Sequence, residues 1–329
     1  MNFYICSTPY HIFISLCHLY SDVRKGVFYL TTHDSNSEQL FVLLKERLNK
    51  LEKVEDVIIR KRSKLMERLL IEECKDRILF NRVKKHLNNN STVFLFPWNP
   101  YSLYTISNYI YKKAKSVIFL EDGANLFLYP EPSKLNLFVK KYLYRISTDF
   151  YLDKRLKKIM VQYPERYPKH LFEKLEYLDL KPMFNHLNNM EKDLIIGVFL
   201  EEKKANMLLD FKQKDSIIIL TQPLSEDGYI TEKEKIMLYK DIIDTHKEYQ
   251  IVIKKHPRER TVYGINEIIE LDGSFPSEIF SMLDIGFKKA VGVCTSAISG
   301  INAEEKYNTD ENFLQRGKNN DKAIYSNRK

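Results

Sequence analysis

The stretch Ile251-Val-Ile-Lys-Lys-His-Pro-Arg258 joins a β-branched run to a proline. The run has the composition of a strand, and proline cannot donate a hydrogen bond to a sheet ladder. The strand must therefore end before Pro257, which places the His256 imidazole at its carboxyl end. In open α/β sheets, ligands bind at that edge. His256 is thus the first candidate for chemistry, although a histidine before proline is often structural.

A second stretch, Ser116-Val-Ile-Phe-Leu-Glu121-Asp122-Gly123, has the same form, because an apolar strand ends there in two carboxylates and a glycine. An acid and a base delivered by two strand ends predict a two-domain enzyme. The bland interpretation is an acidic turn with glycine at positive φ. Glu226-Asp227-Gly228 repeats the pattern and shows how common it is. We prefer Asp122, because it follows a buried-type strand where partial desolvation makes a carboxylate a stronger base.

Segments of strand and helix type alternate along the chain, as is typical of βαβ units with parallel sheets. A length of 329 residues suits two domains. A polar stretch around Pro182 and 185–189 is the best linker. The sequence therefore predicts an α/β protein with a first domain over 1–185, a second over 186–306 and a polar, disordered tail over 307–329.

The formal net charge of +8 and a pI near 9.0 indicate an anionic partner. Nucleic acid, a nucleotide-sugar, a phosphorylated lipid or an acidic membrane surface would all qualify. The cationic side chains Lys254, Lys255, Arg258 and Arg260 surround His256 and would hold a phosphate-bearing ligand. Thr295-Ser296 lies between a strand and a helix start, where hydroxyls and backbone N–H groups can bind phosphate, although an ordinary N-cap is the simpler reading.

The four cysteines, Cys6, Cys17, Cys74 and Cys294, lie far apart and form no CxxC pair. This pattern argues against a disulfide framework or a zinc knot and fits a reducing cytoplasm. No run approaches the roughly 18 apolar residues of a membrane span. The N-terminus reads as a first strand and not as a signal peptide.

Missing motifs also narrow the function. The sequence contains no Asp-x-Asp motif of metal-chelating glycosyltransferases. It has neither GxGxxG nor Walker A, so a dinucleotide oxidoreductase or a P-loop NTPase has no support. No HExxH or Cys/His cluster indicates zinc. We therefore expect no metal and no cofactor.

Glu121-Asp122-Gly123, Lys255-His256-Pro257 and Thr295-Ser296, in this order and spacing, resemble the motifs of bacterial sialyltransferases. The chain is most similar to glycosyltransferase family 52, which contains lipooligosaccharide and streptococcal capsule sialyltransferases. The resemblance implies two Rossmann-like domains facing a cleft, the glycosyltransferase B architecture, with the first domain on the acceptor side and the second binding the donor. It implies a CMP-sialic acid donor, a galactose-terminated acceptor of capsule or lipooligosaccharide, inversion at the anomeric carbon and no metal.

The resemblance also assigns roles to residues. His256 matches the general acid toward the CMP phosphate, and Asp122 matches the general base. Asp227 competes for the base role, because family 52 also places a carboxylate after the first strand of the second domain. We expect substrate-binding positions at Thr8, Pro9, Glu121, Gly123, Gln222, Pro223, Lys255, Pro257, Phe275, Pro276, Thr295 and Ser296.

A basic, aromatic helix over 133–148 interleaves Lys134, Lys140, Lys141 and Arg145 with Phe138, Tyr142 and Tyr144. It either packs its aromatics into the first domain or contacts the inner membrane leaflet near a lipid-linked acceptor. We expect a cytoplasmic protein with peripheral membrane contact, no nucleic-acid partner and a homodimer. Two other functions stay open: a UDP- or GDP-sugar transferase of the same architecture, and a non-catalytic basic protein that binds nucleic acid or anionic membrane through 134–145.

Overall fold

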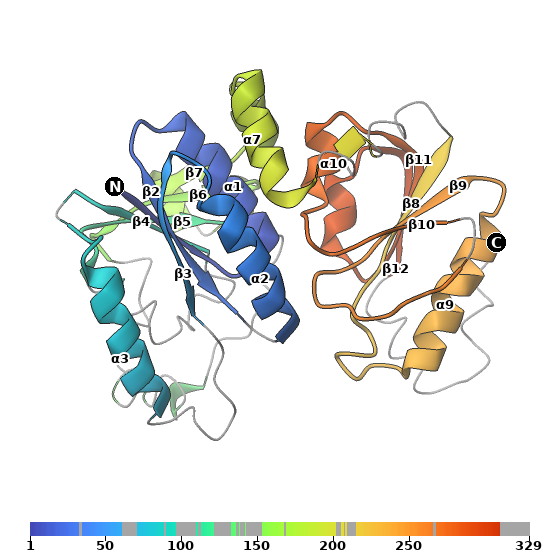
Figure 1. The fold of residues 1–329 in the computed structure, drawn as a ribbon, viewed down its shortest axis with the longest axis horizontal. Helices are drawn as coiled ribbons and strands as arrows, with labels where there is room; N and C mark the ends of the chain where they lie inside the picture. The colour runs from blue at the N-terminus through green and yellow to red at the C-terminus, as the bar shows by residue number, and fades with distance from the viewer. Residues whose placement is uncertain are drawn as a thin grey trace. The chain divides into compact units, whose positions relative to one another are not determined.

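The computed structural model describes residues 1–32, 35–60, 71–88, 90–96, 110, 113–121, 133–135, 138, 142, 153–167, 169–201, 205–206, 208, 215–265 and 268–309. The chain divides into two compact units, Met1–Val198 and Phe199–Lys329 (Figure 1). Each unit is built on its own parallel sheet.

The first unit contains a seven-stranded sheet in the order β3-β2-β1-β4-β5-β6-β7, with every neighbouring pair parallel. All residues of β1 and β2 are buried, as expected for a parallel sheet covered on both faces. The strands are β1 (Asn2–Cys6), β2 (Gly26–Thr31), β3 (Val54–Arg60), β4 (Thr92–Leu95), β5 (Ser116–Leu120), β6 (Leu156–Val161) and β7 (Leu175–Tyr177).

The helices of this unit begin with α1, for which the Thr8-Pro9 pair supplies the start. The Thr8 hydroxyl accepts a hydrogen bond from the N–H of His11, and Pro9 occupies the first turn. The helices are α1 (Pro9–Ser21), α2 (Ser35–Leu48), α3 (Ile71–Lys84), α6 (Leu180–Asn185) and α7 (Asn189–Phe199), with 3-10 turns η3 (Pro164–Arg166) and η4 (Lys169–Lys174). The order in which β1 lies between β2 and β4 is that of a Rossmann-type sheet.

The second unit repeats this plan with a five-stranded parallel sheet in the order β10-β9-β8-β11-β12. Its strands are β8 (Ser216–Leu220), β9 (Gln250–Lys254), β10 (Ile269–Leu271), β11 (Phe287–Val293) and β12 (Ala303–Thr309). Its helices are α9 (Glu232–Thr245), α10 (Glu278–Met282) and the 3-10 helix η6 (Ser296–Gly300). Tyr239 and Ile243 of α9 pack against Ile217 and Ile219 of β8. Figure 1 shows α9 and α10 on opposite sides of this sheet.

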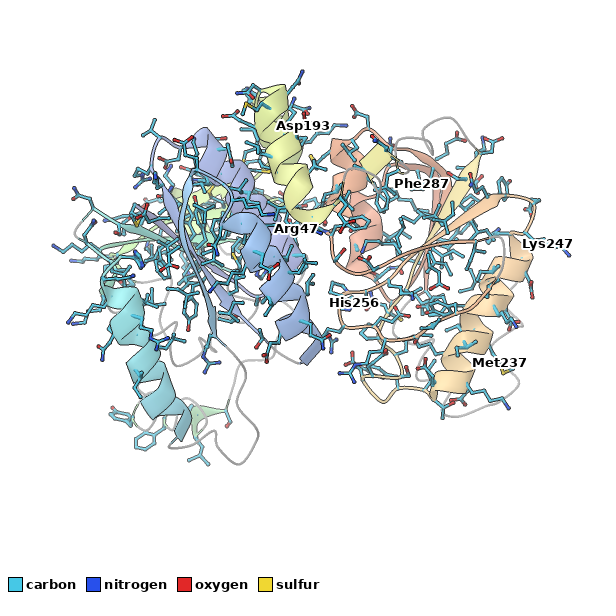
Figure 2. The ribbon with its side chains drawn as sticks, in the orientation of Figure 1. Arg47, Asp193, Met237, Lys247, His256 and Phe287 are labelled. Atoms are coloured by element: carbon cyan, nitrogen blue, oxygen red, sulfur yellow. The ribbon has the colours of Figure 1, made fainter. Side chains whose placement is uncertain are left out.

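The α/β class and the parallel sheets predicted from the sequence are confirmed. The division between the units differs from the predicted boundary at 185/186, because α7 belongs to the first unit. Arg47 of α2 donates a hydrogen bond to the carbonyl of Val198 at 3.2 Å (Figure 2). Lys192 of α7 lies 5.9 Å from the centre of the Phe184 ring on α6. The polar stretch at 185–189 is therefore a turn between two helices of one unit.

The predicted tail over 307–329 also differs from the structure at its beginning. Residues 307–309 belong to β12, where Tyr307, Asn308 and Thr309 pair with Val291, Gly292 and Val293 of β11. The polar composition of β12 fits its place as the last strand of the sheet, where most of its side chains are exposed. Residues 310–329 lie outside the described residues.

Candidate active site

The loops that follow β8, β9 and β11 carry most of the predicted site of the second unit. These strands are neighbours and parallel, so their carboxyl ends meet at one edge of the sheet. The edge lies where the chain reverses its direction of winding, between β8 and β11, which is where open α/β sheets bind ligands. The structure thereby brings together Gln222, Pro223, Lys255, His256, Pro257, Thr295 and Ser296 at one edge.

His256 lies just after β9, on the loop predicted from Pro257 (Figure 2). Its ring Nδ1 accepts a hydrogen bond from the N–H of Arg258 at 3.1 Å. A neutral imidazole whose Nδ1 accepts carries its proton on Nε2. Burial, together with the nearby cations Arg258 and Lys254, lowers the pKa of His256 to about 4. The ring is therefore neutral at pH 7, with Nε2–H available as a donor.

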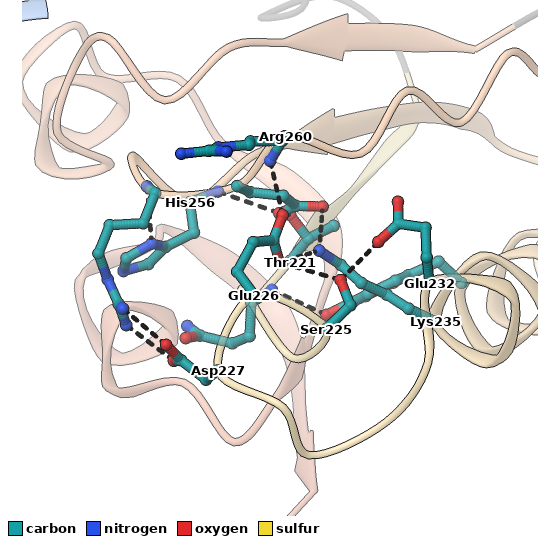
Figure 3. A network of polar contacts seen from close by, with 12 residues as sticks. Thr221, Ser225, Glu226, Asp227, Glu232, Lys235, His256 and Arg260 are labelled. Atoms are coloured by element: carbon teal, nitrogen blue, oxygen red, sulfur yellow. Dashed lines mark hydrogen bonds and ion pairs between the residues drawn. The ribbon is translucent and has the colours of Figure 1, made fainter. Parts of the chain in front are cut away.

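Asp227, the competing candidate base, pairs with Arg258, which follows His256 by two residues. The guanidinium of Arg258 donates to both carboxylate oxygens of Asp227, at 2.7 and 2.8 Å (Figure 3). Such a bidentate pair fixes the orientation of the carboxylate. Arg258 therefore contacts both candidates: its backbone N–H donates to His256, and its guanidinium donates to Asp227.

A buried set of charges beneath His256 is not anticipated by the sequence analysis. The ammonium of Lys235 lies 2.8 Å from Glu226 and 3.3 Å from Glu259, and the Lys235 and Glu259 side chains are fully buried. Partial burial acts to raise the pKa of Glu226, but its bonds to Lys235 and to the N–H of Arg260 together lower it to about 2. Lys235 lies in a helix whose charged sequence is typical of a solvated surface, so no local pattern marks it.

Gly273, in the loop after β10, packs directly against the candidate acid's loop. A Cβ at this position would lie 2.4 Å from Cα of Pro257 and 2.7 Å from the carbonyl oxygen of His256. Only glycine allows this approach of two backbones. Gly273 therefore fixes where the His256-Pro257 segment runs.

Two predicted binding residues after β10 have internal roles in the second unit. Phe275 and Pro276 are buried, and the Phe275 ring lies 4.3 Å from Nζ of Lys254. Lys254 also donates to the carbonyls of Lys255 and Asp272, which ties the loops after β9 and β10 together. Burial lowers the pKa of Lys254 to about 8.

The predicted phosphate loop at Thr295-Ser296 is shaped by its neighbours. Cys294 adopts φ of 52°, in the left-handed region, and Thr295 caps η6 by accepting from the N–H of Ala297 at 3.3 Å. The side-chain amide of Asn308 accepts from the N–H of Thr295 at 3.2 Å and donates to its carbonyl at 2.9 Å. The capping interpretation of Thr295 is thus present, and phosphate binding stays a prediction. Asn308 is a positioning residue that the sequence analysis places in a disordered tail.

The other predicted residues at this edge of the sheet are held by backbone hydrogen bonds and an ion pair. The N–H of Gln222 donates to the hydroxyl of Tyr239 at 2.9 Å, and Pro223 is buried. Lys255 pairs with Glu270 of β10 at 2.7 Å. These contacts hold the segments in place, and the substrate-binding roles of Gln222, Pro223 and Lys255 stay predictions.

In the first unit, the carboxyl ends of β1, β5 and β6 carry the second set of predicted residues. Glu121 is buried and accepts a hydrogen bond from the N–H of Gln162, whose amide donates to the Tyr10 hydroxyl at 3.0 Å. Thr8 and Pro9 serve the start of α1. Asp122 and Gly123 lie outside the described residues, so the general base role of Asp122 stays a prediction.

The described residues contain neither a cluster suited to a metal ion nor a helix suited to a membrane span. No three His, Cys, Asp or Glu side chains among them gather closely enough to hold a metal ion. Within the same described part of the chain, every helix is too short or too polar to cross a membrane.

The sequence model of glycosyltransferase family 52 matches residues 25–308. The chain belongs to this family. The match spans both units and includes every described site residue from Glu121 to Ser296, so the predicted resemblance is confirmed and the protein is a glycosyltransferase. Over 277 residues, the chain is 27% identical to an uncharacterized protein of Haemophilus influenzae, with 82% of this chain and 86% of that relative covered.

Solved structures show the same fold at low sequence identity. The glycosyltransferase B domain of a Photobacterium damselae sialyltransferase matches with a TM-score of 0.58, 12% identity and 93% and 89% of the two chains covered. An α/β-galactoside α-2,3-sialyltransferase of Photobacterium phosphoreum matches with a TM-score of 0.60 and 12% identity, with 93% of this chain and 90% of that chain covered. A 2,6-sialyltransferase of Photobacterium sp. JT-ISH-224, solved with CMP and lactose, matches with a TM-score of 0.60 and 12% identity, with 93% of this chain and 70% of that chain covered. The family 52 chain therefore has the glycosyltransferase B fold.

The contact at Gly273 generates a prediction on stability. Gly273→Ala should lower the free energy of unfolding by about 1–3 kcal/mol, the usual cost of overpacking, because the new methyl meets backbone atoms that cannot rotate away. Gly197→Ala is the matched control, since a Cβ at Gly197 on α7 meets nothing within 4 Å. That control should be neutral or stabilising by up to about 1 kcal/mol. Equal denaturation midpoints for the two variants would contradict the close approach.

Proposed function

We propose that this glycosyltransferase is a metal-independent, inverting sialyltransferase. It moves sialic acid from CMP-sialic acid to a galactose-terminated oligosaccharide of capsule or lipooligosaccharide. The observation that carries the proposal is His256, a neutral imidazole with Nε2–H available at the ligand-binding edge of a family 52 chain. The sialyltransferase folds of the solved relatives, one of them holding CMP and lactose, support the choice of donor and acceptor.

Sialyl transfer requires an acid that protonates the leaving group and a base that removes the proton of the acceptor hydroxyl. Sialyl transfer passes through an oxocarbenium-like state while the CMP phosphate departs, and donors aimed at the departing charge stabilise it. His256 donates from Nε2 toward that phosphate. The arriving negative charge opposes the desolvation that lowers the pKa of the free ring to about 4. Ligand binding therefore raises the pKa of His256 and favours the imidazolium, which can give its Nε2 proton to the departing phosphate and return to the neutral ring.

The metal-independent part of the proposal assigns charge stabilisation to side chains of the second unit. Lys255 and Arg258 flank His256 on the loop after β9, and Arg260 follows on the same loop. Cations at this edge raise the potential felt by a phosphate. The backbone N–H groups around Thr295 and Ser296 are the second source of donors in this proposal.

The acid assignment predicts the effect of one substitution. His256→Ala should lower sialyl transfer from CMP-sialic acid to lactose by about 10²–10⁴-fold, because proton donation to the leaving group is lost. The assay is run in excess EDTA, where the wild type should keep its activity. Stabilisation against heat by CMP and not by UDP or GDP identifies the donor class. Wild-type activity in the variant, or activity that requires added Mn²⁺ or Mg²⁺, would contradict the proposal.

The two candidate bases predict different losses. Asp122→Ala should lose about 10²–10⁴-fold in turnover and keep its CMP affinity, because the base contacts the acceptor. Asp227→Ala should lose less than about tenfold, because the guanidinium of Arg258 already occupies both oxygens of this carboxylate. Turnover numbers and calorimetric CMP affinities decide between them. A dead Asp227→Ala variant beside a mildly impaired Asp122→Ala variant would make Asp227 the base.

A cytoplasmic location with peripheral membrane contact is a further part of the proposal. The described side chains of the basic, aromatic helix include Leu135, Phe138 and Tyr142, which are exposed, with the two aromatic rings 4.6 Å apart. Lys134 is exposed beside them, and Lys140, Lys141, Tyr144 and Arg145 lie outside the described residues. An exposed apolar and basic surface suits an anionic leaflet near a lipid-linked acceptor. The predicted homodimer stays a prediction.

Membrane contact can be separated from catalysis. Each lysine or arginine near an anionic surface contributes about 1 kcal/mol, so replacing Lys134, Lys140, Lys141 and Arg145 by glutamine should abolish salt-sensitive binding to phosphatidylserine vesicles. Transfer to lactose, which is not lipid-linked, should stay near the wild-type rate. Vesicle binding that survives the four substitutions would contradict the membrane role.

A further inference from the structure

Glu259 is a buried carboxylate that joins separate segments of the second unit. Its side chain is fully buried and lies 3.3 Å from Nζ of Lys235 on α9. It also accepts hydrogen bonds from the hydroxyl of Thr221 after β8, from the hydroxyl of Tyr263 at 2.5 Å and from the N–H of His256 at 3.4 Å. Figure 3 shows Thr221, Lys235 and His256, three of the residues that Glu259 joins.

Stability alone is a weak reason for such a group. Removing a carboxylate and an ammonium from water costs several kcal/mol for each ion, and hydrophobic residues of similar volume often stabilise a fold equally well or better. The donors around Glu259 offset part of that cost by satisfying the carboxylate oxygens. What a hydrophobic pair cannot supply is a fixed set of directional bonds to two loops.

Glu259 also closes the turn that contains His256. The N–H of Glu259 donates to the carbonyl of His256 at 3.0 Å, while the N–H of His256 donates to the Glu259 carboxylate. Between these two bonds lie Pro257 and Arg258, and the Arg258 N–H is the group that donates to Nδ1 of the imidazole. The turn held by Glu259 therefore presents the donor that sets which ring nitrogen carries the proton.

The same turn is tied to the loop after β8 by three contacts. The Thr221 hydroxyl donates to Glu259, the Arg260 N–H donates to Glu226 at 2.7 Å, and Arg258 binds Asp227. The Arg258 pair is partly exposed, where ion pairs contribute little, whereas the Glu259 carboxylate is fully buried. Loss of Glu259 thus removes the buried contact between the His256 turn and the loop after β8, which is the contact least weakened by solvent.

We infer that Glu259 is a positioning residue for His256, which holds the imidazole in its Nε2–H form and aims that N–H at the ligand-binding edge. Glu259 acts through the turn and does not contact the substrate. The catalytic part of this inference rests on the proposed function, because it requires His256 to be the proton donor. The tautomer part concerns the protein itself and can be measured without substrate.

The test uses the full chain with ¹⁵N-labelled histidine and two variants. Glu259→Gln keeps the size of the side chain and loses its charge. Lys235→Met with Glu259→Leu removes both buried charges, so that neither ion of the pair is left buried without the other. The His256 signals are assigned by their absence in His256→Ala. In the wild type, the ¹⁵N shifts should report a single Nε2–H tautomer, and in both variants a mixture of tautomers.

Turnover supplies the second readout. Both variants should lose about 10–100-fold in kcat, a range typical for residues that orient a functional group from behind, with KM for CMP-sialic acid changed less than about threefold. Glu304→Gln, which breaks the surface pair with Lys288 on β11 and β12, is the control for loss of an ion pair and should change neither kcat nor the tautomer.

The outcomes separate this inference from the proposed function. A folded variant that keeps the pure Nε2–H tautomer of His256 would overturn the positioning role. A wild type that does not use CMP-sialic acid would overturn the proposed function, and the NMR comparison would then decide the positioning role alone. If Glu259→Gln does not fold, the double variant supplies both readouts.

Discussion

The parallel pairing of β9 with β8 and of β8 with β11 is the constraint on which the rest of the second unit depends. Parallel neighbours end at the same edge, so the loops that begin at Thr221, Lys255 and Cys294 converge without any direct sequence signal between them. Each loop is then fixed by a different device. The buried Glu259 carboxylate binds the loops at Thr221 and at Lys255. The absence of a side chain at Gly273 leaves room for the loop at Lys255. The Asn308 amide binds the loop at Cys294.

The electrostatics of this edge follow from where its charges are buried. The interior pair of Lys235 and Glu259 is shielded from water, whereas Arg258 and Asp227 meet at the surface. Arg258 and Lys254 lower the pKa of His256, and the carboxylates of Asp227 and Glu226 oppose them. The imidazole is thus held neutral, and the outer cation, Arg258, already has a carboxylate partner in Asp227.

The sequence predicts those features that are set by neighbours along the chain. Pro257 ends β9, Thr8 and Pro9 begin α1, and β-branched runs mark the buried strands, because proline, capping and periodicity act over a few residues. Contacts between distant residues are not predictable in this way. In the sequence, Lys235 and Glu259 resemble charged surface residues. Gly273 resembles an ordinary turn glycine, and Asn308 lies in a polar segment that resembles a tail. Only the fold shows that Asn308 reaches Thr295.

The link from Asn308 to Thr295 makes the outermost strand part of the hydroxyl-bearing loop. Strands at the margin of a sheet open more readily than central ones, since fewer neighbours hold them. A movement of Asn308 in β12 would therefore displace the partner of Thr295, whereas His256 follows β9, a strand with β10 on one side and β8 on the other. The two loops therefore depend on different parts of the sheet: His256 follows an interior strand, whereas Thr295 is held by a side chain from the sheet's border.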